Sequence, residues 1–162
     1  YSPSWESPGD GSGHGSCASP SVWLQICSVL FDCHNQKSYG ANYSTPDGEI
    51  TFQTSMTGFV DDTKGQCNDS TEDEPLPLQE LIERMQADAQ LWGDLLHVSG
   101  GALEIPKCNY YVMQRRFKPS GRPELDKDVN TTLHLGNGDR TASITLTNDA
   151  VTVAHKTLGT WK

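Results

Sequence analysis

Two adjacent carboxylates, Asp61 and Asp62, follow a mainly apolar stretch in the sequence GFVDDT at residues 58–63. Burying such an acid pair without partners is costly, so the pair should be exposed or should bind a cation. Carboxylate oxygens suit hard divalent cations, and two such cations can activate a hydroxyl and stabilise a leaving pyrophosphate. An Asp-Asp pair at the end of a strand is, however, more often an exposed turn. Taken alone, the acid pair supports either a metal site or a simple turn.

The strand that must position the acid pair is predicted over residues 49–60, because EITFQTSMTGFV alternates in part and is rich in Thr, Phe, Ile and Val. The preceding residues 36–48 have turn composition. Residues 63–77 are polar and acidic and include two prolines. Any strand that pairs after the acid pair must therefore be short.

Two helices are predicted, one before and one after this strand. The first spans about 19–35, where Ser19 can act as the N-cap and Pro20 occupies the first helical position. The second spans about 78–99 and follows the 3.6-residue period until two glycines at 100–101 stop it. At about 1.5 Å per residue it is roughly 33 Å long, enough to lie across the back of a sheet.

The rest of the chain is predicted to be mostly strands. Segments 102–106 and 109–117 read as strand pieces, and short strands are expected over 131–135, 143–147 and 151–154. The order of helix, strand, helix and several strands predicts an α+β fold in which two helices back an antiparallel sheet.

The charge of the chain is strongly negative, with 12 Lys and Arg residues against 21 Asp and Glu residues and a net charge of −9. This is the wrong sign for a domain that binds nucleic acid by itself. The charge is uneven, since residues 69–74 hold four carboxylates whereas residues 107–118 hold four cations and no acid. The basic stretch could face a phosphate backbone through Arg115 and Arg116, although such a run is more often a solvated face.

Composition also indicates the compartment. Five cysteines without a CxxC pair argue against a disulfide framework and against a zinc ribbon, and there is no signal peptide, so we expect an intracellular protein of the cytoplasm or nucleus. No stretch has the roughly 18 to 20 apolar residues that a membrane span needs, so no membrane partner is expected. Residues 1–17 are rich in Ser, Gly and Pro and are predicted to be a disordered or severed loop of a longer protein.

Four short motifs, in the right order, resemble those of reverse transcriptases, the RNA-directed DNA polymerases of retroelements. HGSCASP at 14–20 is similar to the family's Q-G-x-x-x-S-P segment, with His14 in place of Gln, and FVDD at 59–62 resembles the aromatic-x-D-D catalytic turn. GGALEIPKC at 100–108 resembles the G-x-x-L-x-x-x-K segment, and KTLG at 156–159 is similar to the L-G turn of the primer grip. The resemblance runs from about residue 11 to the end.

The resemblance implies two-metal nucleotidyl transfer onto a primer 3′-hydroxyl. Asp61 and Asp62 would be catalytic carboxylates and ligands of two magnesium ions, with manganese as the alternative ion, and Lys107 would be a catalytic residue near the nucleotide phosphates. The partners implied for the full-length parent are an RNA or DNA template, a primer and a deoxynucleoside triphosphate. Leu158 and Gly159 would belong to the primer grip. The nucleotide and template would be contacted by His14, Gly15, Ser19, Pro20 and Phe59.

The fold that the resemblance implies is a palm-like antiparallel sheet backed by two helices, an incomplete polymerase fold. Residues 18–162 would form the palm fragment and the start of the primer-grip and thumb region. The family's other metal-binding Asp lies on a strand upstream of the Q-G segment, and Asp10 cannot serve because it sits in a Gly/Ser/Pro loop. We therefore expect the fragment to hold part of the metal site and not to polymerise by itself.

Two alternatives remain. The chain could be a non-catalytic retroelement relic, which the missing Asp and His14 favour. It could instead be an acidic interaction module that binds calcium through Asp61, Asp62 and residues 69–74, although the chain lacks a D-x-[DN]-x-[DN]-G loop.

Overall fold

The computed structural model describes residues 19–59, 62–68, 76–126, 129–136, 143–147, 156–157 and 160–161. Three helices lie within these residues, namely α1 (Ser19–Lys37), α2 (Leu78–Val98) and the short 3-10 helix η1 (Ile105–Lys107). The described strands are β1 (Ala41–Ser44), β2 (Thr51–Thr54), β3 (Met56–Phe59), β4 (Asp62–Gly65), β5 (Arg115–Phe117), β6 (Pro123–Leu125), β7 (Thr132–Gly136), β8 (Ser143–Thr147), β9 (Lys156–Thr157) and β10 (Thr160–Trp161).

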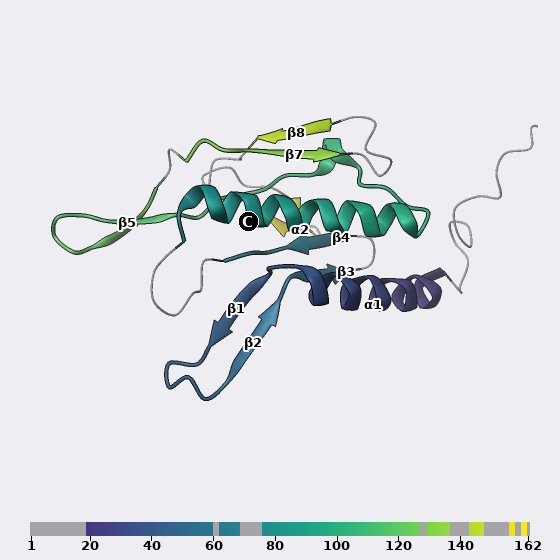
Figure 1. Cartoon of the computed structure of the whole chain (residues 1–162), viewed down its shortest axis with the longest axis horizontal. Coiled ribbons are helices and arrows are strands. Elements are labelled where there is room, and N and C mark those ends of the chain that lie inside the picture. Colours follow the sequence, from purple (N-terminus) through teal and green to yellow (C-terminus); the bar gives the residue numbers. More distant parts are fainter. Residues whose placement is uncertain are drawn as a thin grey trace, which may run out of the picture.

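The strands form small hairpins. Each described strand pairs antiparallel with one neighbour in the chain, which gives the two-stranded sheets β1–β2, β3–β4, β5–β6, β7–β8 and β9–β10. In Figure 1, α2 runs along the long axis of the molecule between the β7–β8 and β3–β4 hairpins. The predicted α+β class is confirmed in this form, as two helices with small antiparallel sheets that do not close.

Both predicted helices are confirmed, and the end of α2 shows why the glycine pair stops it. Gly100 adopts a φ of 88°, which favours glycine, and the Gly101 N–H donates to the Leu96 carbonyl oxygen at 2.8 Å. This hydrogen bond satisfies a carbonyl that the last turn would otherwise leave free. Among the described residues, no helix has both the length and the apolar character needed to cross a bilayer.

The strand predictions need correction at three places. The strand expected over 49–60 is two strands, β2 and β3, separated at Ser55, and residues 41–44, predicted as turn, form β1. The strand predicted over 102–106 is wrong, because a 3-10 turn with proline in its first positions stands there. Of the segment 109–117, only the last three residues are a strand.

Two other strand predictions are confirmed by β7 and β8, although β7 begins one residue later than expected. The strand predicted over 151–154 lies outside the described residues. The short β6, which pairs with β5, was not predicted.

The core consists of two clusters, and α2 contributes to both. One cluster joins α2 to α1 and β3, and within it Phe31 stacks on Trp92 with ring centroids 5.4 Å apart. The other joins α2 to β7 and to the segment before β5. Helix α2 is therefore the element around which the described part of the chain is built. The buried members are Leu30, Met56, Trp92 and Leu96 in the first cluster, and Ile82, Tyr110, Val112 and Leu133 in the second.

Candidate functional site

The acid pair lies at the connection of the β3–β4 hairpin. Phe59, the last residue of β3, is the register partner of Asp62, the first residue of β4, so only residues 60 and 61 connect the two strands. Asp62 is exposed, whereas Asp61 and the side chain of Phe59 lie outside the described residues. The partner strand, β4, is short, as the sequence required of any such strand, but it begins at Asp62 itself and not after the acid pair.

The hairpin is packed against α1. Met56 is buried in the first core cluster. Gly58 faces the ring of Phe31 so closely that a Cβ at this position would lie 2.5 Å from Phe31 Cζ. A side chain at this position would force the Phe31 ring to shift, which favours a glycine in the strand that leads to the acid pair.

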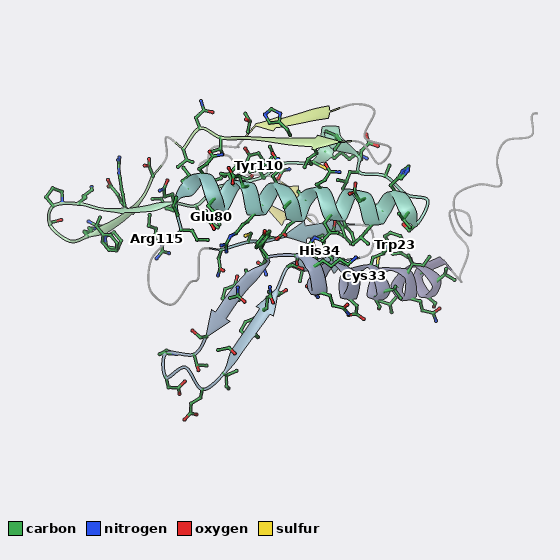
Figure 2. All side chains as sticks on the ribbon, viewed as in Figure 1. Trp23, Cys33, His34, Glu80, Tyr110 and Arg115 are labelled. Atoms are coloured by element: carbon green, nitrogen blue, oxygen red, sulfur yellow. The ribbon has the colours of Figure 1, made fainter. Side chains whose placement is uncertain are left out.

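A buried histidine ties the start of β3 to both helices. His34 on α1 is 1% exposed, and its Nδ1 lies 2.8 Å from Ser55 Oγ. Its Nε2 lies 2.9 Å from the backbone carbonyl oxygen of Asp88 on α2. Because a carbonyl oxygen can only accept, Nε2 carries the proton and donates it. Figure 2 shows His34 between α1 and α2.

The carboxylate of Asp88 completes this connection. Its two oxygens accept the backbone N–H groups of Tyr39 at 2.8 Å and Gly40 at 2.9 Å, so α2 holds the turn after α1. Asp88 is only 9% exposed. Neither His34 nor Asp88 is among the site residues predicted from the sequence. The available signal was an acid at position 88, on the apolar stripe of α2 between Met85 and Trp92, where the helical period expects an apolar side chain.

The other predicted site residues are spread along the fold. Ser19 is the first residue of α1, and Pro20 beside it is exposed. Lys107 is exposed at the end of η1, and the described contacts do not join it to Asp62. In Figure 1 the start of α1, the end of α2 and the adjoining ends of β3 and β4 lie toward the same end of the long axis. Four predicted residues lie outside the described part of the chain: His14, Gly15, Leu158 and Gly159.

The described donors can be compared with what a metal ion requires. Asp62 offers carboxylate oxygens, which suit a hard divalent cation, and its exposure lets it reach one without a burial cost. Within the described ranges, no three side chains of His, Cys, Asp or Glu lie together as a metal site would need. Asp62 could therefore supply one part of a cation's ligand set.

Cys67 lies just after β4, at the root of this hairpin. The pKa of its thiol is raised from 9.0 to about 11, mainly by burial and also by the Asp88 carboxylate, while Arg84 opposes the rise. The adjoining backbone is fixed, since the Gln66 N–H donates to the Ser55 carbonyl oxygen at 2.9 Å. Cys67 is consequently a protonated structural thiol near neutral pH rather than a nucleophile.

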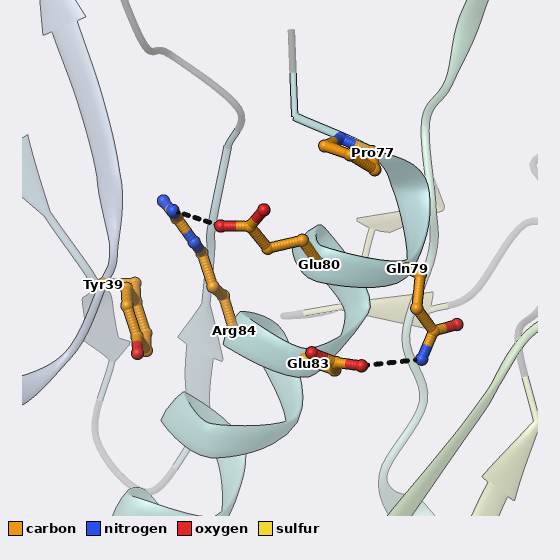
Figure 3. A pocket seen from close by; sticks show the side chains of 6 residues that line it. All are labelled: Tyr39, Pro77, Gln79, Glu80, Glu83 and Arg84. Atoms are coloured by element: carbon orange, nitrogen blue, oxygen red, sulfur yellow. Dashed lines mark hydrogen bonds and ion pairs between the residues drawn. The ribbon is translucent and has the colours of Figure 1, made fainter.

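An open groove of about 510 Å³ lies at the start of α2, between Pro77 and Tyr39 (Figure 3). Arg84 stands over the Tyr39 ring at 5.1 Å and pairs with Glu80 at 2.6 Å. The arginine charge is therefore already neutralised within the groove. Because α2 starts at the end of the long axis away from the acid pair, this groove is separate from the β3–β4 turn.

Comparison with protein-family models, with curated proteins and with solved structures found no match to this chain.

Proposed function

We propose that this chain forms the palm portion of a reverse transcriptase that acts in the cytoplasm or nucleus. The observation that carries the proposal is the β3–β4 hairpin, in which Asp62, the second acid of the pair, is the register partner of Phe59 and whose first strand packs on α1. A palm-like arrangement requires such a hairpin with helices behind it. Here α1 and α2 pack together through the cluster that contains Met56 of β3.

In this proposal Asp61 and Asp62 hold magnesium through their carboxylate oxygens. Bound magnesium would neutralise phosphate charge and activate the primer hydroxyl. The contribution of the protein is position. Gly58 brings β3 against Phe31, and the bond between His34 and Ser55 fixes the start of the strand, so the hairpin is held by the body of the molecule. An exposed Lys107 ammonium would meet the nucleotide phosphates and could donate a proton to the leaving pyrophosphate.

The test is primer extension on an RNA template with magnesium, using a polypeptide that contains this chain with its flanking gene sequence. We expect Asp61→Asn to lower the extension rate at least roughly 100-fold, about 2.7 kcal/mol of transition-state stabilisation. The matched control is Asp47→Asn, because Asp47 is an exposed acid near the tip of another hairpin, β1–β2. It should leave the rate unchanged.

The alternatives predict different outcomes. Equal extension by the wild type and Asp61→Asn would remove Asp61 from the mechanism. No extension by either protein would favour the non-catalytic relic. A site that prefers calcium to magnesium would favour the acidic interaction module.

A further inference from the structure

A second exposed hairpin has a charge opposite to that of the chain. Residues 115–125, which we call the basic ribbon, comprise β5, a turn and β6. They hold four cations and one carboxylate, Glu124, whereas the remainder of the chain holds eight cations and twenty carboxylates. In Figure 1 the ribbon extends from the body at the end of the long axis where α2 begins. It is a local basic surface on an acidic protein.

The strand register separates the ribbon into two faces. Arg116 is opposite Glu124, and Lys118 lies two residues further along the same face. Glu124 accepts from Arg116 Nε at 3.0 Å and pairs with Lys118 Nζ at 2.6 Å. The carboxylate is thus engaged by these two cations.

The other face combines an unpaired cation with exposed apolar groups. Arg115 is opposite Leu125 and is exposed, and within the described part of the chain it pairs with no carboxylate. Phe117 lies two residues along and is 73% exposed, while Leu125 is 40% exposed. An aromatic ring with a guanidinium beside it on a projecting strand can stack a nucleic acid base and bind the adjacent phosphate.

The β1–β2 hairpin provides the contrast within the same molecule. Its exposed aromatic residues, Tyr43 and Phe52, already stack on each other with centroids 5.0 Å apart. Its tip carries the acids Asp47 and Glu49, and residues 41–54 contain no Lys or Arg. Exposed aromatic rings therefore occur on both hairpins, but Phe117 stacks on no ring within the described ranges and lies next to Arg115, which has no carboxylate partner there.

We propose that the Arg115–Phe117 face of the basic ribbon binds single-stranded nucleic acid, with a base stacked on Phe117 and a phosphate on Arg115. The surplus cations of the opposite face raise the local potential and attract the polyanion. This inference deepens the proposed function, because it names where the template or primer strand contacts the chain. It does not depend on the chemistry of the acid pair.

The test is fluorescence anisotropy of a labelled oligouridine with the whole chain at low ionic strength and without divalent metal. We expect Phe117→Ala to weaken binding roughly tenfold, because a stacked base is lost. Arg115→Gln should weaken binding and make the negative slope of log affinity against log salt less steep by about 0.7. This is the value for one phosphate contact to a single strand. Phe52→Ala is the matched control, since Phe52 is 58% exposed on the acidic hairpin, and it should change nothing.

One further ligand and one further variant separate the explanations. Poly-glutamate should bind much more weakly than oligouridine, and its binding should be insensitive to Phe117→Ala. Three results would overturn the proposal: Phe117→Ala weakens the binding of both polymers equally, Phe117→Ala leaves oligouridine binding unchanged, or the wild type does not bind oligouridine. Tight binding of poly-glutamate would indicate an acidic protein partner instead. Asp61→Asn should bind oligouridine normally, so a failure of catalysis and a failure of the ribbon can be told apart.

Discussion

The β3–β4 hairpin and the basic ribbon are both two-stranded antiparallel hairpins, but they are attached to the molecule in different ways. The first begins next to buried Ser55 and contains buried Met56, and Gly58 touches Phe31. The ribbon contains no buried side chain between residues 115 and 125. A metal-binding turn must keep its carboxylates in place, whereas a surface for a flexible strand gains from adaptability. The way each hairpin is anchored therefore agrees with the role proposed for it.

The largest effect is expected where the anchor is broken. Asp88→Ala removes the acceptor of the Tyr39 and Gly40 N–H groups and leaves both without their carboxylate partner. We expect a loss of about 3 kcal/mol in the free energy of unfolding, measured by urea denaturation. Glu83→Ala on the exposed face of the same helix is the control and should cost less than about 0.5 kcal/mol. Equal losses in the two variants would contradict the anchoring role of Asp88.

The second largest loss of stability is expected at the contact of the β3–β4 hairpin with α1. Gly58→Ala places a Cβ 2.5 Å from Phe31 Cζ, and the ring cannot retreat easily because it stacks on Trp92. We expect destabilisation of about 2 kcal/mol. In Gly101→Ala the nearest heavy atom would lie 3.5 Å away, an ordinary contact, so that variant should be close to wild type.

Adding Phe31→Leu to Gly58→Ala should restore part of the loss, because the smaller side chain makes room. If the double variant is less stable than the sum of the single changes predicts, the Phe31 contact is not the cause.

The thiol of Cys67, just after β4, should be protected from alkylation in the folded protein. Because the folded chain raises the pKa of Cys67 from an ordinary 9.0 to about 11, it holds the proton more tightly than the unfolded chain does. Stability should therefore fall as pH rises from about 9 to 11. Alkylation at pH 8, followed by mass spectrometry of the Cys67 peptide, should be much slower in the native protein than in urea. Similar alkylation rates in the native protein and in urea would show that Cys67 is accessible to solvent in the folded chain.

The smallest effect is expected on the ribbon. Phe117 is 73% exposed, so Phe117→Ala removes little buried apolar surface. The free energy of unfolding should change by less than about 0.5 kcal/mol. A larger loss, measured by the same urea denaturation, would mean that Phe117 supports the fold, and it would weaken the contrast between the two hairpins.

Local pattern was sufficient for much of the fold. The two long helices follow the apolar period, and Gly100 ends α2 as predicted. The strand β1 was missed because ANYS at 41–44 carries little strand signal, and it forms by pairing with β2. The segment 102–106 has strand-like residues, but Pro106 cannot donate a backbone hydrogen bond, and a 3-10 turn results.

The part of the site that depends on local sequence could also be predicted. The position of Asp62 beside the end of a strand follows from local sequence. The contact between His34 and Asp88 joins residues 54 positions apart, and no spacing rule connects them. Such long-range contacts depend on how α1 and α2 pack, which the pattern of each helix alone does not determine.

The most direct test of the central claim is to locate divalent metal on the hairpin. Manganese added in small amounts to the isotope-labelled chain broadens the NMR signals of nuclei near its binding site, even when binding is weak. We expect the signals of Gly58 and Thr63, which flank the acid pair within a few residues, to broaden before those of Asp47 and Glu49 on the β1–β2 tip, and we expect Asp61→Asn to abolish this preference. Equal broadening at both hairpins, or the same broadening in Asp61→Asn, would contradict a metal site at Asp61 and Asp62.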